Sequence, residues 1–440
     1  MGNSSAAIES DRLCDFFGCL IDNNVSVADA VQAYIQACLG GDACWINLPK
    51  DAYPAVDRTM IFEHPDAERD YLEAVKKWNT MTNPVTILRM ALYGHPDSVT
   101  MWELKCDEDV KSVGFRPLGA EWPSVYFHSE LSLLLVIYVD DFKLAGPDKN
   151  IAKGWALLRS KLSIGPDGPL GMYLGCNQSR VKIELPGKIP AMCIIYDMES
   201  FLEQCVARYL EVAGKNIKFK EAKTPFLADQ GVHGPARDPM KGDLPCCSWC
   251  GYVEVLSTSA GSASAVGGDS PSALDEGDEP GQLAEGARSV LMKIMYAARM
   301  ARFDLLRPVQ GLAKHFTKWK KRHDEELYKL VCYINTTKNR KMIGWVGDEI
   351  KNIQPHLFSD SDFAGTEGTL KSTSGVHLCL RGPHTSFPLS GQSKRQGCVS
   401  SSTTEAELVA GSLALRTAGL PIIGVMNLLH KAQSKEPVQT

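Results

Sequence analysis

Residues 131–145 read LSLLLVIYVDDFKLA, an apolar run that ends in two adjacent carboxylates. The run Leu131–Val139 is short and rich in Leu, Val and Ile, which is typical of a buried strand. Asp140 and Asp141 would then form a turn, and Phe142–Ala145 would return as a second strand. The stretch therefore predicts an antiparallel hairpin with two acids at its tip.

The two acids are costly at that position, because like charges repel and the strand behind them is dry. A divalent cation would remove the cost. Two Mg²⁺ ions roughly 4 Å apart are what an in-line nucleotidyl displacement uses. A solvated Asp-Asp turn is the alternative, and the dipeptide alone does not decide between them.

The chain has 440 residues, 44% apolar and 22% charged, as expected for two or three globular domains. No apolar run reaches the roughly 18 residues of a membrane span, so we expect neither an integral membrane protein nor a membrane partner. The first residues give no signal peptide, and 14 scattered cysteines favour reduced thiols inside the cell, cytoplasmic or nuclear. Cys247 and Cys250 form one CxxC with no second pair, which favours a loop over a zinc site.

Charge is unevenly distributed along the chain. Residues 1–145 hold 22 acids and 11 bases, net −11, whereas residues 288–341 hold 14 bases and 4 acids, net +10. A compact basic segment predicts contact with a polyanion from that region. Between the two, Ser257–Ala287 has 20 Gly, Ala, Ser or Pro among its 31 residues, which predicts a disordered linker.

Residue patterns also predict the other helices and strands. Val25–Leu39 reads as a strand running into a helix. Further helices are expected at Asp107–Val113, Ser200–Val212, Ser289–Met300, Pro308–Trp319, Asp324–Asn335 and Ser402–Leu415, and strands at Met342–Val346, His356–Ser359 and Val376–Leu380.

Tyr138-Val139-Asp140-Asp141 after a Leu- and Val-rich run resembles the signature of reverse transcriptases. Phe142–Gly146 resembles the Leu-Leu-Ile-Ala-Gly that follows it in copia-type retrotransposons, and Asp29–Ile35 resembles that family's Asp-Val-Lys-Thr-Ala-Phe-Leu. The resemblance implies that Asp29 is a third metal-binding carboxylate. It also implies that Tyr34 packs under the incoming sugar and excludes a 2′-hydroxyl; a polar Asp29 at a helix start with Tyr34 in the core is the alternative.

Other segments extend the resemblance over roughly residues 20–430. Ala91–Gly94 followed by Trp102 resembles Ala-Leu-Tyr-Gly…Trp, but His95-Pro96-Asp97 stands where the family has Leu-Lys-Gln, which disfavours nucleotide binding. Gly171–Gly175 resembles the turn near the primer grip. Lys223-Thr224-Pro225 and Val290–Arg302 also match family patterns.

The C-terminal motifs resemble the ribonuclease H of the same polyprotein. They are Phe358–Gly365, Lys371–Gly375 and Ser401–Glu407, and they make Asp360 and Glu407 its first two carboxylates. No Asp follows Asp362, so the site lacks a ligand, and we expect weak metal binding and little or no cleavage.

The basic segment offers a nucleic-acid contact by charge. Its candidate residues are Lys314, Lys318, Trp319, Lys320, Lys321 and Arg322. A cationic helix face with Trp319 for stacking is one interpretation, and a merely solvated basic face is the other.

These observations together predict an α+β protein. The expected parts are a truncated reverse-transcriptase palm with a ferredoxin-like sheet (1–227), a linker (228–287), a basic helical connection (288–345) and a partial ribonuclease H-like α/β domain (346–440). The function implied is that of an RNA-directed DNA polymerase with Mg²⁺ or Mn²⁺, two ions per site, and no organic cofactor. Its partners would be RNA template, DNA primer, deoxynucleoside triphosphates and other polyprotein fragments. The alternative is a catalytically decayed remnant that at most binds nucleic acid.

Overall fold

The computed structural model describes residues 6–53, 55–56, 60, 65–214, 216–227, 279–366 and 370–433. These residues form both helices and strands, so the protein is a mixed α and β chain. Every pairing between the named strands is antiparallel. Most of the predicted linker, with Cys247 and Cys250, lies outside the described residues. Its last part does not: Pro280 bridges Lys320, and α6 begins at Ala284.

The first sheet contains the predicted hairpin. Its order is β1–β7–β6–β5–β4, with β1 (Asn23–Asp29), β4 (Arg116–Pro117), β5 (Val125–His128), β6 (Leu133–Tyr138) and β7 (Asp141–Pro147). Five of the six residues of β6 are buried, which confirms the buried strand and its returning partner. The segment after β1 is a short 3₁₀ helix, η1 (Ala33–Gln36), rather than the longer helix expected there.

The second sheet joins regions that the sequence analysis separates. Its order is β12–β13–β14–β11–β10–β9–β8, with β8 (Met172–Tyr173), β9 (Cys176–Leu185), β10 (Ile189–Asp197), β11 (Met342–Val346), β12 (Gln354–Thr366), β13 (Lys371–Gly382) and β14 (Thr385–Arg395). Strands β10 and β11 pair from Met192↔Val346 to Tyr196↔Met342. This pairing joins the segment expected to be a palm (1–227) to β11, which spans the boundary expected between residues 345 and 346. The predicted turn before β9 is confirmed: Leu174 and Gly175 both have left-handed φ, 48° and 70°.

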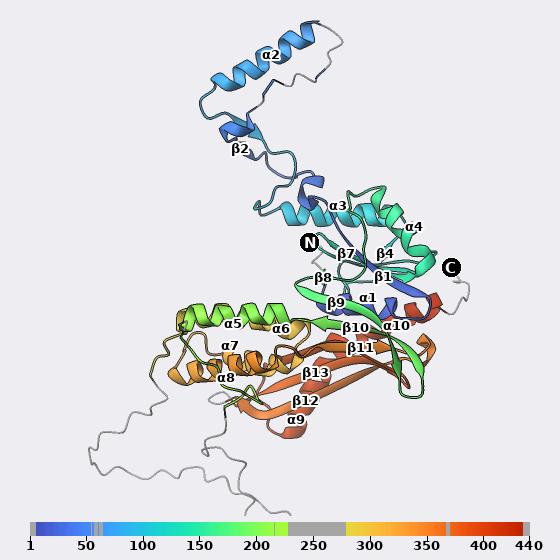
Figure 1. The fold of residues 1–440 in the computed structure, drawn as a ribbon, viewed down its shortest axis with the longest axis vertical. Helices are drawn as coiled ribbons and strands as arrows, with labels where there is room; N and C mark the ends of the chain where they lie inside the picture. Colours follow the sequence, from blue (N-terminus) through green and yellow to red (C-terminus); the bar gives the residue numbers. More distant parts are fainter. Residues whose placement is uncertain are drawn as a thin grey trace, which may run out of the picture.

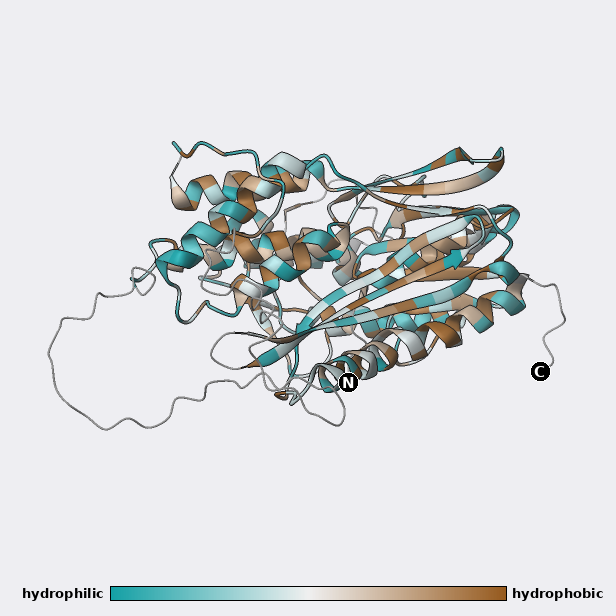
Figure 2. Ribbon diagram, turned by 90° about the horizontal axis from the view of Figure 1, so that it is seen from below, coloured by the Kyte–Doolittle hydropathy of each residue, from teal (hydrophilic) through white to brown (hydrophobic). Residues whose placement is uncertain are grey.

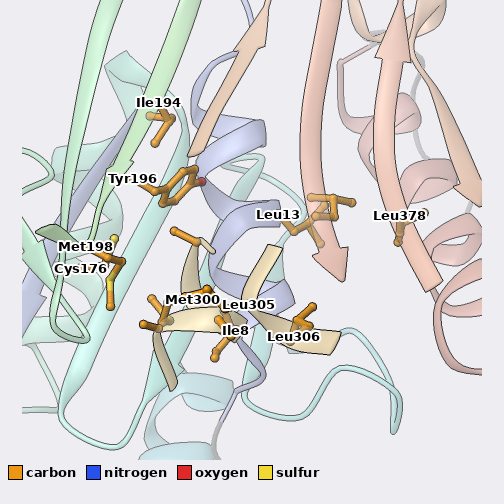
Figure 3. Close-up of a cluster of buried hydrophobic side chains, with 14 of the residues drawn as sticks. Ile8, Leu13, Cys176, Ile194, Tyr196, Met198, Met300, Leu305, Leu306 and Leu378 are labelled. Carbon is orange, nitrogen blue, oxygen red and sulfur yellow. The ribbon is translucent and has the colours of Figure 1, made fainter. Parts of the chain in front are cut away.

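Helix α1 (Ile8–Gly18) lies between the two sheets, and all of its residues except Glu9 are buried. It packs against β1, β6 and β7 on one side and β11 and β14 on the other. Figure 3 shows Ile8 and Leu13 of α1 in one cluster with Ile194, Tyr196 and Leu378 from the seven-stranded sheet. One hydrophobic core therefore spans both sheets.

Four helices lie side by side at one end of the seven-stranded sheet (Figure 1). They are α5 (Glu199–Ala213), α6 (Ala284–Met300), α7 (Leu306–Ala313) and α8 (Lys321–Thr337), with η3 (Phe303–Leu305) before α7. The predicted helix over Pro308–Trp319 ends six residues early, so residues 314–320 form a connection rather than a helix face.

The remaining elements include a separate two-stranded sheet, β2–β3, and helices α3 and α4. Figure 1 shows α2 and β2 projecting from the rest of the molecule. The elements are β2 (Trp45–Asn47), η2 (Lys50–Ala52), α2 (Pro65–Thr80), β3 (Val85–Ile87), α3 (Ser98–Ser112), α4 (Asp148–Arg159) and η4 (Ile350–Asn352).

The C-terminal segment is one continuous helix, made of α9 (Thr403–Ala414), a π-helical turn, η5 (Leu415–Gly419), and α10 (Leu420–Gln433). Figure 2 shows it running along the sheet, with apolar residues on much of its length. By length and composition alone, Thr403–Ala432 could cross a membrane, although no apolar run predicts this. One face of this helix packs in the common core through Ile422 and Leu429. Core helices of soluble proteins also meet the same length and composition criteria, so a single such helix is weak evidence for a membrane span.

Candidate active site at the β6–β7 hairpin

Sheet register brings two of the predicted carboxylates together. Asp29 at the end of β1 is the direct cross-strand partner of Asp141 at the start of β7. Ala30 N–H donates to the carbonyl oxygen of Asp140 at 2.8 Å. This hydrogen bond joins the residue after Asp29 to the residue before Asp141. Directly opposed residues project from the same face of a sheet with Cβ atoms about 5 Å apart, so the carboxyls of Asp29 and Asp141 meet.

The neighbouring acids perturb Asp141. Burial, followed by the charges of Asp140 and Asp29, raises the pKa of Asp141 to about 7, and the Asp29 and Asp141 carboxyls share a hydrogen bond. Asp29 and Asp140 are exposed. A divalent ion can replace the proton that two carboxyl groups share, because the ion neutralises both carboxylates.

The third carboxylate does not complete a site in this conformation. In the described part of the chain, no group of three or more His, Cys, Asp or Glu side chains is arranged to hold a metal ion. Asp29 and Asp141 fit a bridging pair, whereas Asp140 occupies the exposed tip of the turn.

A buried tryptophan fixes the backbone of the turn. Val139 has φ 59°, a left-handed conformation that is strained for a β-branched residue. The indole Nε1–H of Trp102, from α3, donates to the Val139 carbonyl at 2.7 Å. Trp102 is 1% exposed, so the residue matched to the family's tryptophan fixes the backbone directly before Asp140.

Tyr34 lies beside this tip. Its pKa is raised by partial burial and then by the charge of Asp140, and its ring centroid is 4.5 Å from that of Tyr93. Tyr34 is half-buried and Tyr93 is 57% exposed. The motif segments at Tyr34 and Tyr93, 59 residues apart in the numbering, therefore form one aromatic surface next to Asp140.

A buried ion cluster under Asp141 was missed by the sequence analysis. Lys143 follows Asp141 by two residues, so both side chains leave β7 on the same face. The fully buried Lys143 Nζ forms ion pairs with Asp11 and with Asp15 (2.9 Å), both on α1. It also donates to Gln178 at 2.7 Å and lies 4.2 Å from the Tyr173 ring centroid.

The cluster keeps Lys143 charged. Burial alone would lower the pKa of Lys143, but Asp11 and Asp15 outweigh it and raise that pKa. Burial raises the pKa of Asp15 to about 7, while Tyr196 donates to Asp15 at 2.8 Å. A lysine inside an apolar strand was the available sequence signal, because a buried lysine needs acidic partners.

The second pair of predicted carboxylates lies on β12 and α9. Ser361 N–H of β12 donates to Glu407 Oε1 at 3.3 Å, so Glu407 reaches the strand beside Asp360. Side chains alternate along β12: Ser359 lies against Gly411 of α9, whereas Phe358 stacks on His377, which contacts Phe303 on the other face.

Asp360 therefore shares the face of Phe358, away from α9. On the same face, Asp362 is engaged by Arg307 and by the backbone N–H of Thr373. The structure brings Asp360 and Glu407 to the same stretch of an edge strand, but not into a three-residue metal group among the described residues.

The basic run at residues 314–322 differs from its prediction. Trp319 is 6% exposed and its Nε1–H donates to Asp324 at 2.6 Å, so its ring is not available for stacking. Lys321 pairs with Glu279 at 3.3 Å and Arg322 with Glu326 at 3.0 Å. The exposed Lys318 and the half-buried Lys320 lie in the connection before α8. A continuous cationic helix face is therefore absent from this segment.

Comparison with known proteins adds one finding. No protein-family model matches the chain. The chain is 25% identical over 366 residues to the Retrovirus-related Pol polyprotein from transposon TNT 1-94 of Nicotiana tabacum. The match covers 81% of this chain and 23% of that polyprotein, so the chain spans about a quarter of the length of this curated relative. The similarity supports an origin as a retrotransposon Pol fragment.

Proposed function

We propose that the chain is a retrotransposon-derived RNA-directed DNA polymerase fragment, with its polymerase site at the β6–β7 hairpin. The observation that carries the proposal is the register of Asp29 against Asp141, directly beside Asp140. In this proposal the five-stranded sheet is a polymerase palm, and β12–β14 with α9 are a partial ribonuclease H domain that does not cleave.

Asp29, Asp141 and Asp140 would hold Mg²⁺ or Mn²⁺. Ions held there would supply the Lewis acidity that activates a primer 3′-oxygen and stabilises the leaving pyrophosphate. Asp29 and Asp141 already lie together, and Asp140 needs only to turn toward them from the exposed tip.

The remaining residues have positioning roles. Trp102 fixes the turn through the Val139 carbonyl, and the Lys143 cluster anchors the strand two residues after Asp141. The rings of Tyr34 and Tyr93, tilted by 46° to each other, lie beside Asp140, where the sugar of a deoxynucleoside triphosphate would pack. Template and primer are the expected partners, and the fragment would act inside the cell.

Primer extension on an RNA template with Mg²⁺ or Mn²⁺ tests the proposal. The wild-type chain should extend the primer and the Asp140→Asn Asp141→Asn double variant should not. Mn²⁺ binding can be measured as the loss of the electron paramagnetic resonance signal of the free ion. This binding should be weaker in the double variant than in the wild type. Undiminished extension by the variant would refute the site. No extension by either folded protein would favour the decayed nucleic-acid binder instead.

A further inference from the structure

The C-terminal helix, α9–η5–α10, carries large apolar side chains on its outer face. Leu408 is 70% exposed, Leu415 55% and Ile423 51%, whereas the opposite face packs in the common core through Ala414 and Leu429. Single exposed apolar residues are normal on a protein surface, but a row of them on one element marks a contact surface. We name Leu408, Leu415 and Ile423 the outer stripe.

The π-helical turn keeps the outer stripe in line. Seven residues, or about two α-helical turns, separate Leu408 from Leu415. Eight residues separate Leu415 from Ile423, but η5 (Leu415–Gly419) lies between them, and a π turn takes one residue more than an α turn. The stripe is therefore straight and evenly spaced, with Leu415 at its middle.

Even spacing about a central residue is what a self-complementary contact needs. A two-fold axis at Leu415, perpendicular to the helix, places a second copy of the helix antiparallel to the first. Leu408 of each copy then lies opposite Ile423 of the other. Such an isologous contact uses the same surface on both subunits, whereas an unrelated partner imposes no such symmetry.

The charge of the helix also favours a second copy over a lipid surface. Arg416 is the one charged residue between positions 408 and 427, and the centres of protein interfaces are poor in charge. A helix that lies on a membrane instead carries many Lys and Arg on a polar face that stays in water. The face opposite the outer stripe is buried in protein.

The length of the helix sets the extent of the contact. Thr403–Ala432 has 30 residues, about 45 Å at 1.5 Å each. Each partner in a stable complex buries ~800 Å². A contact at one end of a helix about 10 Å wide falls well short of that area. Two antiparallel copies that lie together over the whole helix come closest to it, and the outer stripe is at the centre of that arrangement.

We propose that the outer stripe is a homodimer interface, on which a second copy of this chain packs its α9–α10 helix antiparallel with Leu415 at the two-fold axis. Leu420, 64% exposed, flanks the stripe and faces the small, exposed Ser412 of the second copy. The two Arg416 side chains lie beside the axis, so their repulsion limits the affinity and salt strengthens the dimer by screening it. The interface does not depend on the polymerase assignment.

Sedimentation equilibrium of the full chain over about a hundredfold range of concentration tests the proposal. The wild type should pass from monomer to dimer, and Leu408→Ser Ile423→Ser should weaken the dimer about tenfold or more. The matched control is Leu72→Ser Ile87→Ser, which removes the same two kinds of exposed side chain from α2 and β3 (Figure 1). The control should change the dimer dissociation constant less than twofold.

Cross-linking with a short bismaleimide tests the orientation. Leu415→Cys should cross-link to itself across the axis, whereas Leu408→Cys should cross-link to a copy that carries Ile423→Cys and not to itself. Mass spectrometry of the linked peptides distinguishes these products from those of the native cysteines. A link from Leu408→Cys to itself would mean parallel helices and would overturn the proposed interface.

Three other results would also overturn the proposal: a monomer at every concentration, equal weakening in the two double variants, or a dimer that salt weakens. A monomer that binds phosphatidylcholine–phosphatidylserine vesicles through the outer stripe would assign this face to a lipid surface instead. If Leu408→Ser Ile423→Ser does not fold by circular dichroism, Arg416→Gln decides. A severalfold tighter dimer supports the interface, and an unchanged dissociation constant refutes it.

Discussion

The two pairs of carboxylates in this protein are assembled in different ways. Asp29 and Asp141 come from neighbouring antiparallel strands, so the backbone register alone places them opposite each other. Asp360 and Glu407 come from an edge strand and a helix packed on its other face, so the Asp360 side chain lies away from the helix and Glu407 reaches the strand only by accepting the backbone N–H of Ser361. The first pair shares a hydrogen bond, whereas Glu407 is engaged by the backbone and Asp362, beside Asp360, by Arg307.

The two sites also differ in the residues and strands that support them. The hairpin stands on a buried cluster of Lys143, Asp11 and Asp15 and is tied by Trp102. Strands β1 and β12 are both edge strands, but isolated bridges join Val27 to Gly168 and Ala30 to Ile164 beside β1, whereas in the described chain nothing pairs with the outer side of β12. A site built by register keeps its acids together without metal, and a site divided between a strand and a helix needs further ligands from elsewhere.

Asp29→Asn should have the largest effect on chemistry. Losing one ligand to the catalytic ions costs several kcal/mol, so primer extension should fall by roughly three to four orders of magnitude. The matched change Asp360→Asn at the edge site should leave the rate within twofold. Steady-state incorporation of deoxynucleotides measures both. Equal losses would mean that the two carboxylates serve one site.

Lys143→Met should have the largest effect on stability. It leaves Asp11 and Asp15 buried without their cation, which costs about 3–5 kcal/mol. Lys338→Met, which breaks an exposed pair with Glu203, should leave the urea midpoint unchanged. Replacing the whole cluster, with Lys143→Leu, Asp11→Asn and Asp15→Asn, should recover most of the loss. A triple variant as unstable as Lys143→Met would show that the lysine contributes more than charge balance.

The hairpin should also make stability depend on pH. The pKa of Asp141 is raised in the folded protein to about 7 from an ordinary 3.8, so the folded state binds the proton more tightly. The resulting stability is present at low pH and is lost as pH rises through 7. Asp15 acts in the same direction and is present in both proteins compared.

The melting temperature should therefore fall from pH 5 to pH 8, and it should fall less in Asp141→Asn than in the wild type. Added Mn²⁺ should raise the wild-type value at pH 8 more than that of the variant. Parallel pH profiles for the two proteins would contradict the shared proton.

Sequence patterns predicted the hairpin and β11 because each depends on a local signal, an apolar run or branched residues, whereas the β8–β9 turn was expected from the family resemblance. They missed α1, because Asp11, Arg12 and Asp15 interrupt its apolar face although all three are buried. Arg12 donates to the carbonyl of Met300 at 2.8 Å, and Lys143 partners both acids. Such pairing across more than a hundred residues leaves no local pattern.

The candidate site was predictable to a similar degree. Motif matches placed Asp29, Asp140, Asp141 and Tyr34 within reach of one another, and only the fold could show that Asp29 opposes Asp141 while Asp140 stays at the tip. The expected helix face over the basic run is wrong because α7 ends at Ala313, and charge density along a sequence does not show which lysines and arginines have acidic neighbours. Trp319 failed for the same reason, since burial depends on α8 and the segment before α6.

The smallest expected effect comes from a pair of tryptophan variants. The pair distinguishes a tryptophan that positions the turn before Asp140 from one that only stabilises the fold. Trp102→Phe and Trp155→Phe each remove one buried indole hydrogen bond, to the Val139 carbonyl and to Ser26 Oγ, both 2.7 Å. Each should lower the free energy of unfolding by about 1–3 kcal/mol, measured by urea titration. Only Trp102 contacts the residue before Asp140, so only Trp102→Phe should also slow extension, by several-fold with an unchanged KM for nucleotide. If both variants slow extension equally, the tryptophan acts through overall stability, and the strained turn at Val139 has no special part in placing Asp140.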